Sequence, residues 1–293
     1  MTPGLFDPLR RWRAMKVRRQ VINRLNGCFD VEEVEWRPPD GSPLRHGVTT
    51  VKLPMDGIIG PRTMAYGHWH GEHTSLIHQR LPRDAGQRFF LVDVGANIGL
   101  VTRQLVAQNP SMWSGAICFE PEKRNLARLA WNVRSLPNVH IIPNAVSDRD
   151  ADGLLHVDLG NAGDCSLEDL PTRKRSGVEA QVVPMISGAT AFRSISEHRS
   201  PGDRVIWKSD TQGHDLTVLA SMPAELWPET DVATLELRAS SATDEGIDSL
   251  LTIASQFPNR SSVKRGERPI SIEQLESFCR RRSESEFDLL LYR

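Results

Sequence analysis

The residues best suited to chemistry follow an apolar run near position 90. Asp93-Val-Gly95-Ala-Asn97-Ile-Gly99 comes directly after residues 89–92 and directly before a stretch with helical character. A strand, a glycine-rich turn and a helix in this order form a ligand site at the carboxyl end of a parallel sheet. Glycines let the backbone turn tightly and approach a ligand closely. We therefore expect four residues of this motif to bind a cofactor: Asp93, Gly95, Asn97 and Gly99.

An acid after the next strand narrows the choice of ligand. Glu120 follows the apolar run 116–119, and an acid at this place accepts hydrogen bonds from both hydroxyls of a ribose. A dinucleotide site has the spacing G-x-G-x-x-G, whereas Leu100 stands where the third glycine would be. Asp93 suits a cation better than a phosphate. These features favour S-adenosylmethionine, which carries an ammonium group, a carboxylate and a ribose, over a nicotinamide cofactor.

Further motifs follow in the order of a known family. They are Phe119-Glu-Pro121, Asn144-Ala-Val-Ser-Asp148, Gly163-Asp-Cys-Ser-Leu167, residues 178–185 and Trp207-Lys-Ser-Asp-Thr-Gln-Gly-His-Asp-Leu-Thr-Val-Leu219. With the glycine motif, they resemble the FkbM family of S-adenosylmethionine-dependent methyltransferases over residues 88–240. The resemblance implies an α/β fold of the Rossmann-like class I methyltransferase type. Its doubly wound, mostly parallel sheet has seven strands, the last of them antiparallel. The implied activity is O-methylation of a hydroxyl on a sugar, glycan or natural product.

The resemblance also implies roles for single residues. Glu120 would hold the ribose, and Asn144 and Ala145 would border the adenine. Lys208 and Asp210 would lie at the end of the fourth strand, beside the methyl group.

The chain departs from the family pattern after that strand. Ser209 stands where an apolar residue is usual, and His214 and Asp215 stand where a small or aromatic residue and a glutamate are usual. These departures leave open a catalytically inactive protein that binds S-adenosylmethionine.

Methyl transfer to a hydroxyl also needs a base or a metal that takes up the proton or binds the oxygen. Alternation along a strand puts Lys208 and Asp210 on one face, where they act on the acceptor or form an internal ion pair. His214 is a further candidate base because its ordinary pKa is close to neutrality. We expect catalysis from Asp210, Lys208 and His214. Glu236, after the fifth strand, is expected to contact the substrate, to ligate a metal or to be a surface acid.

A histidine-rich run precedes the glycine motif. His68-Trp69-His70-Gly-Glu72-His73 resembles the metal-binding run of metallo-β-lactamase-like hydrolases, and three imidazoles this close can bind zinc. A zinc-dependent hydrolase is therefore the alternative enzyme. We expect no metal here and assign Trp69 and His70 to the substrate pocket, with Trp69 as a stacking surface.

The expected elements divide the chain in two. Residues 1–86 are expected to form an N-terminal extension packed on the core, and residues 87–293 a methyltransferase domain. In the extension we expect a helix over 1–26, short strands at 31–36 and 48–53, a turn-rich stretch at 60–72 and a helix at 73–81. In the domain, strands are expected at 89–94, 116–119, 139–142, 154–157, 178–183, 205–209, 232–237 and 287–292. Helices are expected at 98–107, 122–135, 210–219, 246–254 and 272–281.

Composition limits the remaining possibilities. The 293 residues include 36 basic and 37 acidic side chains, for a net charge of −1, so no overall field attracts nucleic acid. No apolar run approaches the roughly 20 residues of a membrane span. The basic N-terminus leaves open weak contact with a membrane surface. Four scattered cysteines indicate free thiols and a cytoplasmic location. The expected partner is a small-molecule or glycan substrate, and the oligomeric state is left open.

Overall fold

The structure is a computed structural model of the chain. It describes residues 33–45, 47–48, 50–82, 86–168, 177–263, 266–283 and 285–293. The helix expected over residues 1–26, and with it the proposed membrane contact of the basic N-terminus, lies outside the described residues.

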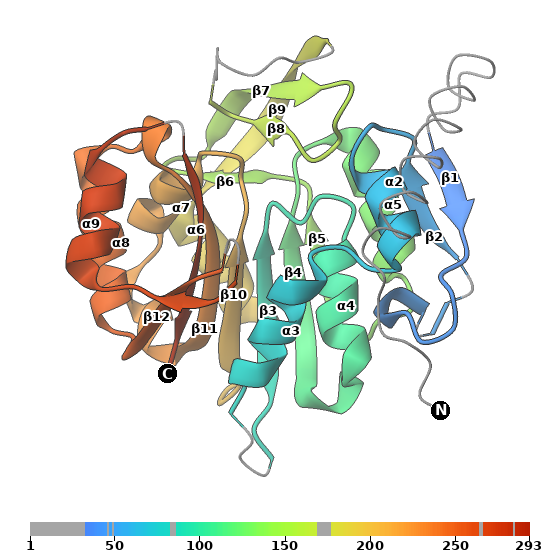
Figure 1. The fold of residues 1–293 in the computed structure, drawn as a ribbon, viewed down its shortest axis with the longest axis horizontal. Helices are drawn as coiled ribbons and strands as arrows, with labels where there is room; N and C mark the ends of the chain where they lie inside the picture. Colours follow the sequence, from blue (N-terminus) through green and yellow to red (C-terminus); the bar gives the residue numbers. More distant parts are fainter. Residues whose placement is uncertain are drawn as a thin grey trace.

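A large, mostly parallel sheet forms the centre of the molecule (Figure 1). Its eight strands in spatial order are β13 (Arg268–Pro269), β12 (Asn259–Ser262), β14 (Glu286–Tyr292), β11 (Thr230–Arg238), β10 (Arg204–Ser209), β3 (Phe89–Val94), β4 (Trp113–Phe119) and β5 (Val139–Ile142). The five strands from β11 to β5 are parallel. β14 lies antiparallel between β11 and β12, which confirms the expected antiparallel last strand. The expected count of seven is wrong, because the two-residue β13 adds an eighth strand and is too short for a periodic pattern.

Helices cover both faces of this sheet because its strands are apolar on both sides. In β3, Phe90 and Val92 face one hydrophobic cluster, whereas Phe89 and Leu91 face the other. The first cluster is completed by α6 (Gly188–His198), α7 (Asp215–Ser221), α8 (Asp244–Ser255) and α9 (Ile272–Arg280). The second is completed by α3 (Gly71–Arg80), α4 (Leu100–Gln108) and α5 (Lys123–Val133). The doubly wound α/β architecture therefore follows from continuous apolar strands.

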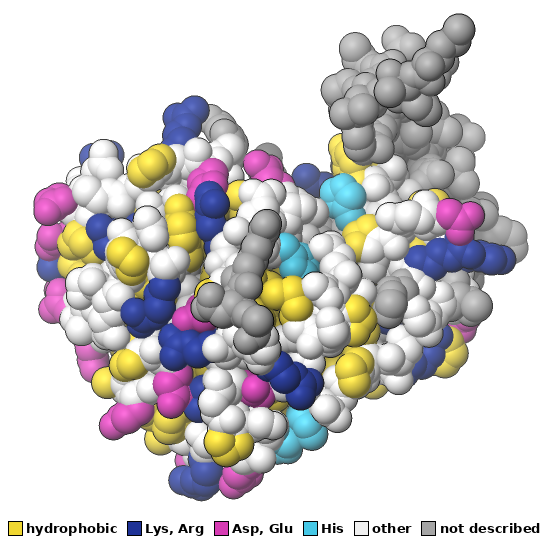
Figure 2. Space-filling view, turned by 90° about the horizontal axis from the view of Figure 1, so that it is seen from below, with side chains coloured by type: hydrophobic (Ala, Val, Ile, Leu, Met, Phe, Trp, Pro, Cys, Tyr) yellow, Lys and Arg dark blue, Asp and Glu magenta, His cyan; other side chains and the backbone are white. Residues whose placement is uncertain are grey.

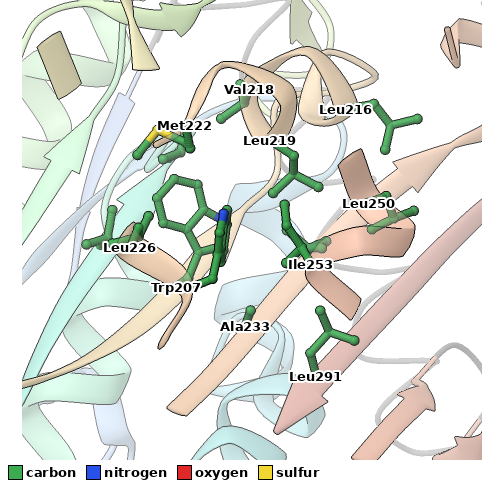
Figure 3. Packing of buried hydrophobic residues seen from close by; sticks show 14 of the residues in the cluster. Trp207, Leu216, Val218, Leu219, Met222, Leu226, Ala233, Leu250, Ile253 and Leu291 are labelled. Atoms are coloured by element: carbon green, nitrogen blue, oxygen red, sulfur yellow. The ribbon is translucent and has the colours of Figure 1, made fainter. Parts of the chain in front are cut away.

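The first cluster is the larger one and centres on a tryptophan. Figure 3 shows Trp207 of β10 beside Leu226 and Met222, and Ile253 of α8 close to Ala233 of β11. The Trp207 ring meets that of Trp227 edge-on, with 5.4 Å between ring centroids. Trp207 lies two residues before the end of β10, so its packing helps to fix the position of the residues that follow.

A smaller sheet lies over the carboxyl ends of the parallel strands (Figure 1). It contains β6 (Ala145–Ser147), β9 (Val178–Ser187), β7 (Ala151–Asp158) and β8 (Cys165–Ser166), in that order. β7 and β9 are antiparallel, which confirms the expected pair of strands. Leu155, Val157 and Val183 form a small core on one face of this sheet.

The segment before β3 packs against the helical layer of α4 and α5. It contains β1 (Glu33–Trp36), β2 (Val51–Pro54) and α2 (Ile59–Tyr66), followed by α3. Apolar residues of β2 and α2 form a cluster with Ile98 and Leu100 at the start of α4. The sequence predicted turns where α2 lies. Pro61 occupies its first turn, where a missing N–H costs no helical hydrogen bond.

Short 3₁₀ helices complete the described elements: η1 (Pro43–Arg45), η2 (Pro110–Met112), η3 (Ala224–Glu229) and η4 (Ala239–Ser241). None of the helices described is long and apolar enough to cross a membrane. Three of the four cysteines are described, and Cys118, Cys165 and Cys279 are free thiols, as expected. Basic and acidic side chains are interspersed on the face drawn in Figure 2.

Candidate functional site

The central sheet has its switch point at β3. The chain runs outward through β4 and β5 on one side, and β10 and β11 lie on the other. Ligands of open α/β sheets bind beyond the carboxyl ends of the strands at this point. Two pockets lie there, and they share Gly95, Asn97, Gly163, Asp210 and Gln212 in their walls. They therefore form one cleft with two arms.

We name the arms after one residue in each. The Glu120 arm is lined by Glu120, Pro121, Asn144, Ala145, Leu155, Cys165, Leu167 and His214, among others. The His70 arm is lined by Arg62, Trp69, His70, Lys208, Glu236, Arg238 and Glu286, among others. The open volume is about 50 Å³ in the Glu120 arm and about 280 Å³ in the His70 arm.

The loop after β3 forms the floor shared by both arms. Gly95 has a φ of 72°, and a Cβ at this position would lie 2.1 Å from the Asp210 carbonyl oxygen. Only glycine therefore fits where the loop passes the end of β10. Asn97 also adopts a left-handed conformation, with a φ of 53°. Its side-chain amide donates to the Ala162 carbonyl at 2.8 Å, which ties the loop to the segment before β8.

Glu120 is a buried acid in the wall of the arm that bears its name. It is 4% exposed, and its carboxylate accepts hydrogen bonds from the backbone N–H of Asn97 at 2.8 Å and of Glu122 at 2.9 Å. Burial raises the pKa of Glu120 to about 7, although these hydrogen bonds act in the opposite direction. Each carboxylate oxygen of Glu120 can accept a further hydrogen bond, which makes the ionised side chain a strong acceptor for a ligand hydroxyl group.

The other predicted residues of the Glu120 arm come from the segment after β5 and the segment after β10. Asn144 and Ala145 line the arm, beyond Glu120. His214 also lines this arm, where one ring nitrogen lies 2.9 Å from Ser147 Oγ and the other 2.8 Å from Glu168 Oε1. Both nitrogens thus have protein partners. The structure separates His214 from the His70 arm, where Lys208 and Glu236 lie.

Two residues of the glycine motif do not line either arm. Asp93 is fully buried, 2.9 Å from the Lys208 ammonium and 2.5 Å from Thr102 Oγ1. Gly99 is the residue before α4, and a Cβ there would lie 2.5 Å from Leu129 Cδ1 of α5. The first residue therefore balances a buried charge, and the second lets two helices pack closely. The sequence suggested direct ligand contact for both, and neither lines an arm of the cleft.

Lys208 has a structural environment as well. Besides Asp93, its ammonium donates to the Gly95 carbonyl at 2.6 Å. The negative charges of Asp93 and Asp210 outweigh burial and raise the pKa of Lys208. The ion pair that the sequence suggested within β10 is therefore formed with β3 instead. It holds the glycine loop against the end of β10.

Asp210 and Glu236 meet in the His70 arm through one side chain. The Gln212 amide nitrogen donates to Asp210 at 2.7 Å and to Glu236 at 2.8 Å. The Gln212 oxygen accepts from Arg238 at 2.5 Å, and Arg238 lies 3.1 Å from Glu286. This chain of contacts crosses from β10 to β11 and β14.

The two carboxyl groups of this network differ in their pKa. Burial opposes ionisation of Asp210, but the charges of Lys208 and His70 lower its pKa overall. Burial and the neighbouring Asp210 carboxylate raise the pKa of Glu236 well above its usual range. Asp210 is thus the ionised member of the pair, and Glu236 is the member that holds a proton more readily.

Two of the residues that depart from the family pattern after β10, Ser209 and Asp215, form a hydrogen bond with each other. The Ser209 hydroxyl donates to the Asp215 carboxylate, which also accepts from the backbone N–H of Thr211 at 3.2 Å. Burial raises the pKa of Asp215 to about 6. Both side chains point away from the cleft, because neither lines an arm. They stabilise the turn between β10 and α7.

The histidine run does not gather its three imidazoles into one metal site. His70 lines the cleft, and His73, whose ring centroid is 5.5 Å from that of His70, lies 3.9 Å from Asp288 of β14. Within the described ranges, no group of three or more His, Cys, Asp or Glu side chains is placed to hold a metal ion. The run therefore lacks the converging ligands that a zinc-dependent hydrolase needs.

Trp69 and His70, which the sequence assigned to a substrate pocket, both line the His70 arm. The two rings are stacked, with centroids 4.7 Å apart. Sequence reasoning missed Arg62, Gln212 and Arg238, which line the same arm. Gln212 alone carried a usable signal, because it follows directly on the end of a strand that was already assigned to the site.

Comparison with known proteins finds only distant similarity. No family model and no curated protein sequence matches the chain. Among solved structures, the methyltransferase FkbM from Methylobacillus flagellatus KT is 13% identical, with a TM-score of 0.40 and an alignment over 97% of this chain. The chain spans 59% of the length of that methyltransferase.

Two further solved structures are similar at the same distant level. A precorrin-6y C5,15-methyltransferase from Geobacter metallireducens GS-15 is 10% identical, with a TM-score of 0.35 over 76% of this chain and 87% of that one. A plantazolicin methyltransferase in complex with SAH is 9% identical, with a TM-score of 0.31 over 75% of this chain and 80% of that one. At these levels the likeness assigns neither a ligand nor a reaction to this chain.

Proposed function

We propose that the chain is an S-adenosylmethionine-dependent methyltransferase that methylates a hydroxyl group on a sugar, glycan or natural product. The observation that carries this proposal is Glu120. It is a buried acid after the second parallel strand, next to a glycine loop at the switch point of the sheet. A carboxylate at this place suits the two hydroxyls of a ribose. The proposal keeps residues 87–293 as the methyltransferase domain and residues 1–86 as its extension.

The residues that line the cleft favour one direction for the cofactor. Asn144 and Ala145 lie in the Glu120 arm and suit the adenine, and Gly95 and Asn97 on the shared floor suit the methionine part. When bound, S-adenosylmethionine supplies an activated methyl group. A nucleoside is larger than the 50 Å³ now open in the Glu120 arm. Leu155 and Leu167, which line this arm from the smaller sheet and the segment after it, would have to move outward for binding.

The acceptor then occupies the His70 arm. Its walls combine an aromatic ring, Trp69, with the carboxyl groups of Asp210 and Glu236. Aromatic faces and carboxylates together suit a molecule with apolar ring faces and several hydroxyl groups, because carboxylates accept hydrogen bonds from hydroxyls. Asp210 lies on the shared floor, so it is the carboxylate best placed to orient an acceptor hydroxyl toward the methyl group.

The proposal is tested in two steps. Calorimetry should detect S-adenosylmethionine and S-adenosylhomocysteine binding to the full chain, and NAD should not bind. Transfer of a labelled methyl group is then measured on a panel of methyl glycosides and polyhydroxylated natural products. Absence of cofactor binding would refute the function. Binding without transfer to any acceptor would favour the inactive cofactor-binding protein.

A further inference from the structure

A histidine outside the parallel sheet lies in the wall of the His70 arm. His70 lies in the loop between α2 and α3, and its side chain is exposed to the cleft. It shares the wall of the His70 arm with Asp210, Lys208 and Glu236. We propose that His70 is the general base that accepts the proton of the acceptor hydroxyl. This inference rests on the proposed function and adds a catalytic role to it.

The backbone at His70 is held in an unfavourable conformation. Its φ of 46° and ψ of 41° lie in the left-handed region, which residues other than glycine rarely adopt. Such conformations are energetically costly and cluster at functional sites. His70 is the residue immediately before α3, and it lines the cleft.

A buried glutamine fixes this strained turn to the cofactor half of the site. Gln104 of α4 is fully buried, and its side-chain oxygen accepts from the Trp69 backbone N–H at 2.7 Å. Its amide nitrogen donates to the Trp69 carbonyl. The α4 helix that carries Gln104 begins immediately after the glycine loop. Gln104 is therefore a positioning residue, which sets His70 relative to the loop that would hold the methionine part.

Burial, together with the neighbouring cationic groups, favours the neutral imidazole of His70, which is the form that accepts a proton. Partial removal from water lowers the pKa of His70, and Lys208, Arg62 and His73 act in the same direction. Asp210 opposes them. The other titratable groups that face this arm come from β11, β14 and the segment before β8: Glu236, Arg238, Glu286 and Asp164. Asp210 would in turn stabilise the imidazolium that forms.

The proton step balances without another reactant. The acceptor oxygen forms the new bond to the methyl carbon, the C–S bond breaks with its electron pair staying on sulfur, and the hydroxyl proton passes to a ring nitrogen of His70. Water then removes the proton from the imidazolium. His214 does not compete for this role, because both of its nitrogens face Ser147 and Glu168 in the other arm.

The first test locates the methyl group. In the complex of the full chain with S-adenosylmethionine labelled with ¹³C on the methyl group, an isotope-filtered NOE should connect that methyl to the His70 ring protons. His70→Asn should remove the cross-peak, and His73→Asn, in the neighbouring helix, should leave it unchanged. A saturated complex with no cross-peak to His70 would overturn the inference. Failure of the cofactor to bind would instead refute the proposed function.

The second test uses the strained backbone. Because φ is 46°, His70→Gly removes the imidazole and relieves strain, so this variant should fold at least as stably as the parent. Methyl transfer to the glycoside acceptor should fall by about 10²–10⁴-fold. Added imidazole should restore part of it, and His198→Ala, on α6 outside both arms, should retain the parent rate. An active His70→Gly variant, or an inactive one that imidazole does not rescue, would contradict the role as base.

Discussion

Replacing Glu120 by glutamine should have opposite effects on stability at low and high pH. Glu120→Gln keeps the size of the side chain and removes its ionisation. In the folded protein the pKa is about 7, against an ordinary value of 4.5. Between these two values the folded state binds more protons than the unfolded state, so the stability of the parent falls as pH rises from about 4.5 to 7. Glutamine does not ionise, so the stability of the variant does not fall over this pH range.

The magnitude follows from the two pKa values. A shift of about 2.5 units corresponds to roughly 3 kcal/mol at pH 8, where the buried carboxylate is fully charged. Glutamine offers one acceptor oxygen to the N–H groups of Asn97 and Glu122, so one of them loses its partner at a cost of about 1–2 kcal/mol. At pH 5 the parent has already lost about 1 kcal/mol of this stability, so the variant should be less stable there by at most about 1 kcal/mol. At pH 8 the variant should be more stable than the parent by about 1–2 kcal/mol.

Urea unfolding of parent and variant at pH 5, 6, 7 and 8 measures this difference. Calorimetry at pH 8 should show that the same change weakens S-adenosylmethionine binding by about 10–100-fold, because charge-assisted hydrogen bonds to the ribose are lost. Glu122→Gln is the matched control, since Glu122 is buried beside Glu120 but does not line the Glu120 arm. It should leave cofactor affinity largely unchanged. A stability difference between parent and Glu120→Gln that does not vary with pH would refute the reasoning.

Three further substitutions separate structural from chemical roles. Asp210→Asn should lower methyl transfer by at least about 100-fold in a labelled-methyl assay, whereas calorimetry should show that cofactor affinity is retained. The reason is that the lost interaction acts mainly in the transition state. An equal loss of methyl transfer and of cofactor affinity would contradict this prediction. Lys208→Met should lower the free energy of unfolding by about 3–5 kcal/mol, since it leaves Asp93 buried without its cation; a variant with the parent's urea midpoint would argue for a chemical role. Gly99→Ala should lower the melting temperature, because the added Cβ would meet Leu129. Cofactor affinity per folded molecule should be unchanged. Loss of cofactor affinity without loss of stability would instead indicate that Gly99 contacts the ligand.

The sequence predicts those parts of the fold in which a local residue pattern is compatible with a single secondary structure and burial. The unbroken apolar run of β3 requires burial on both faces, and β14 likewise ends the chain with three buried leucines. α2 was missed for a different reason. Gly60 and Pro61 in α2 and Gly67 directly after it are turn-forming residues in isolation, and the helix is stabilised by packing of Ile59 against the start of α4. Tertiary contacts thus outweigh local propensity there.

The candidate site was predicted where backbone position alone determines it. Gly95, Asn97 and Glu120 follow directly on strand ends and lie in the cleft. The direction of a side chain depends on partners elsewhere in the chain, which spacing does not reveal. Lys208 turns to Asp93 because a buried carboxylate needs a cation, and that pairing crosses between two strands.

The anchoring of the segment before β3 has a consequence for how specificity changes. The Asp56 carboxylate accepts hydrogen bonds from Ile58, Gly60 and Ala162, and Gln104 holds the Trp69 backbone. The wall of the His70 arm from Arg62 to His70 thus comes from one short, contiguous stretch attached at two points. If the proposed function holds, replacing the stretch between these two attachment points by the corresponding stretch of a related enzyme would change which acceptor is preferred. The parallel sheet and its cofactor contacts would need no change.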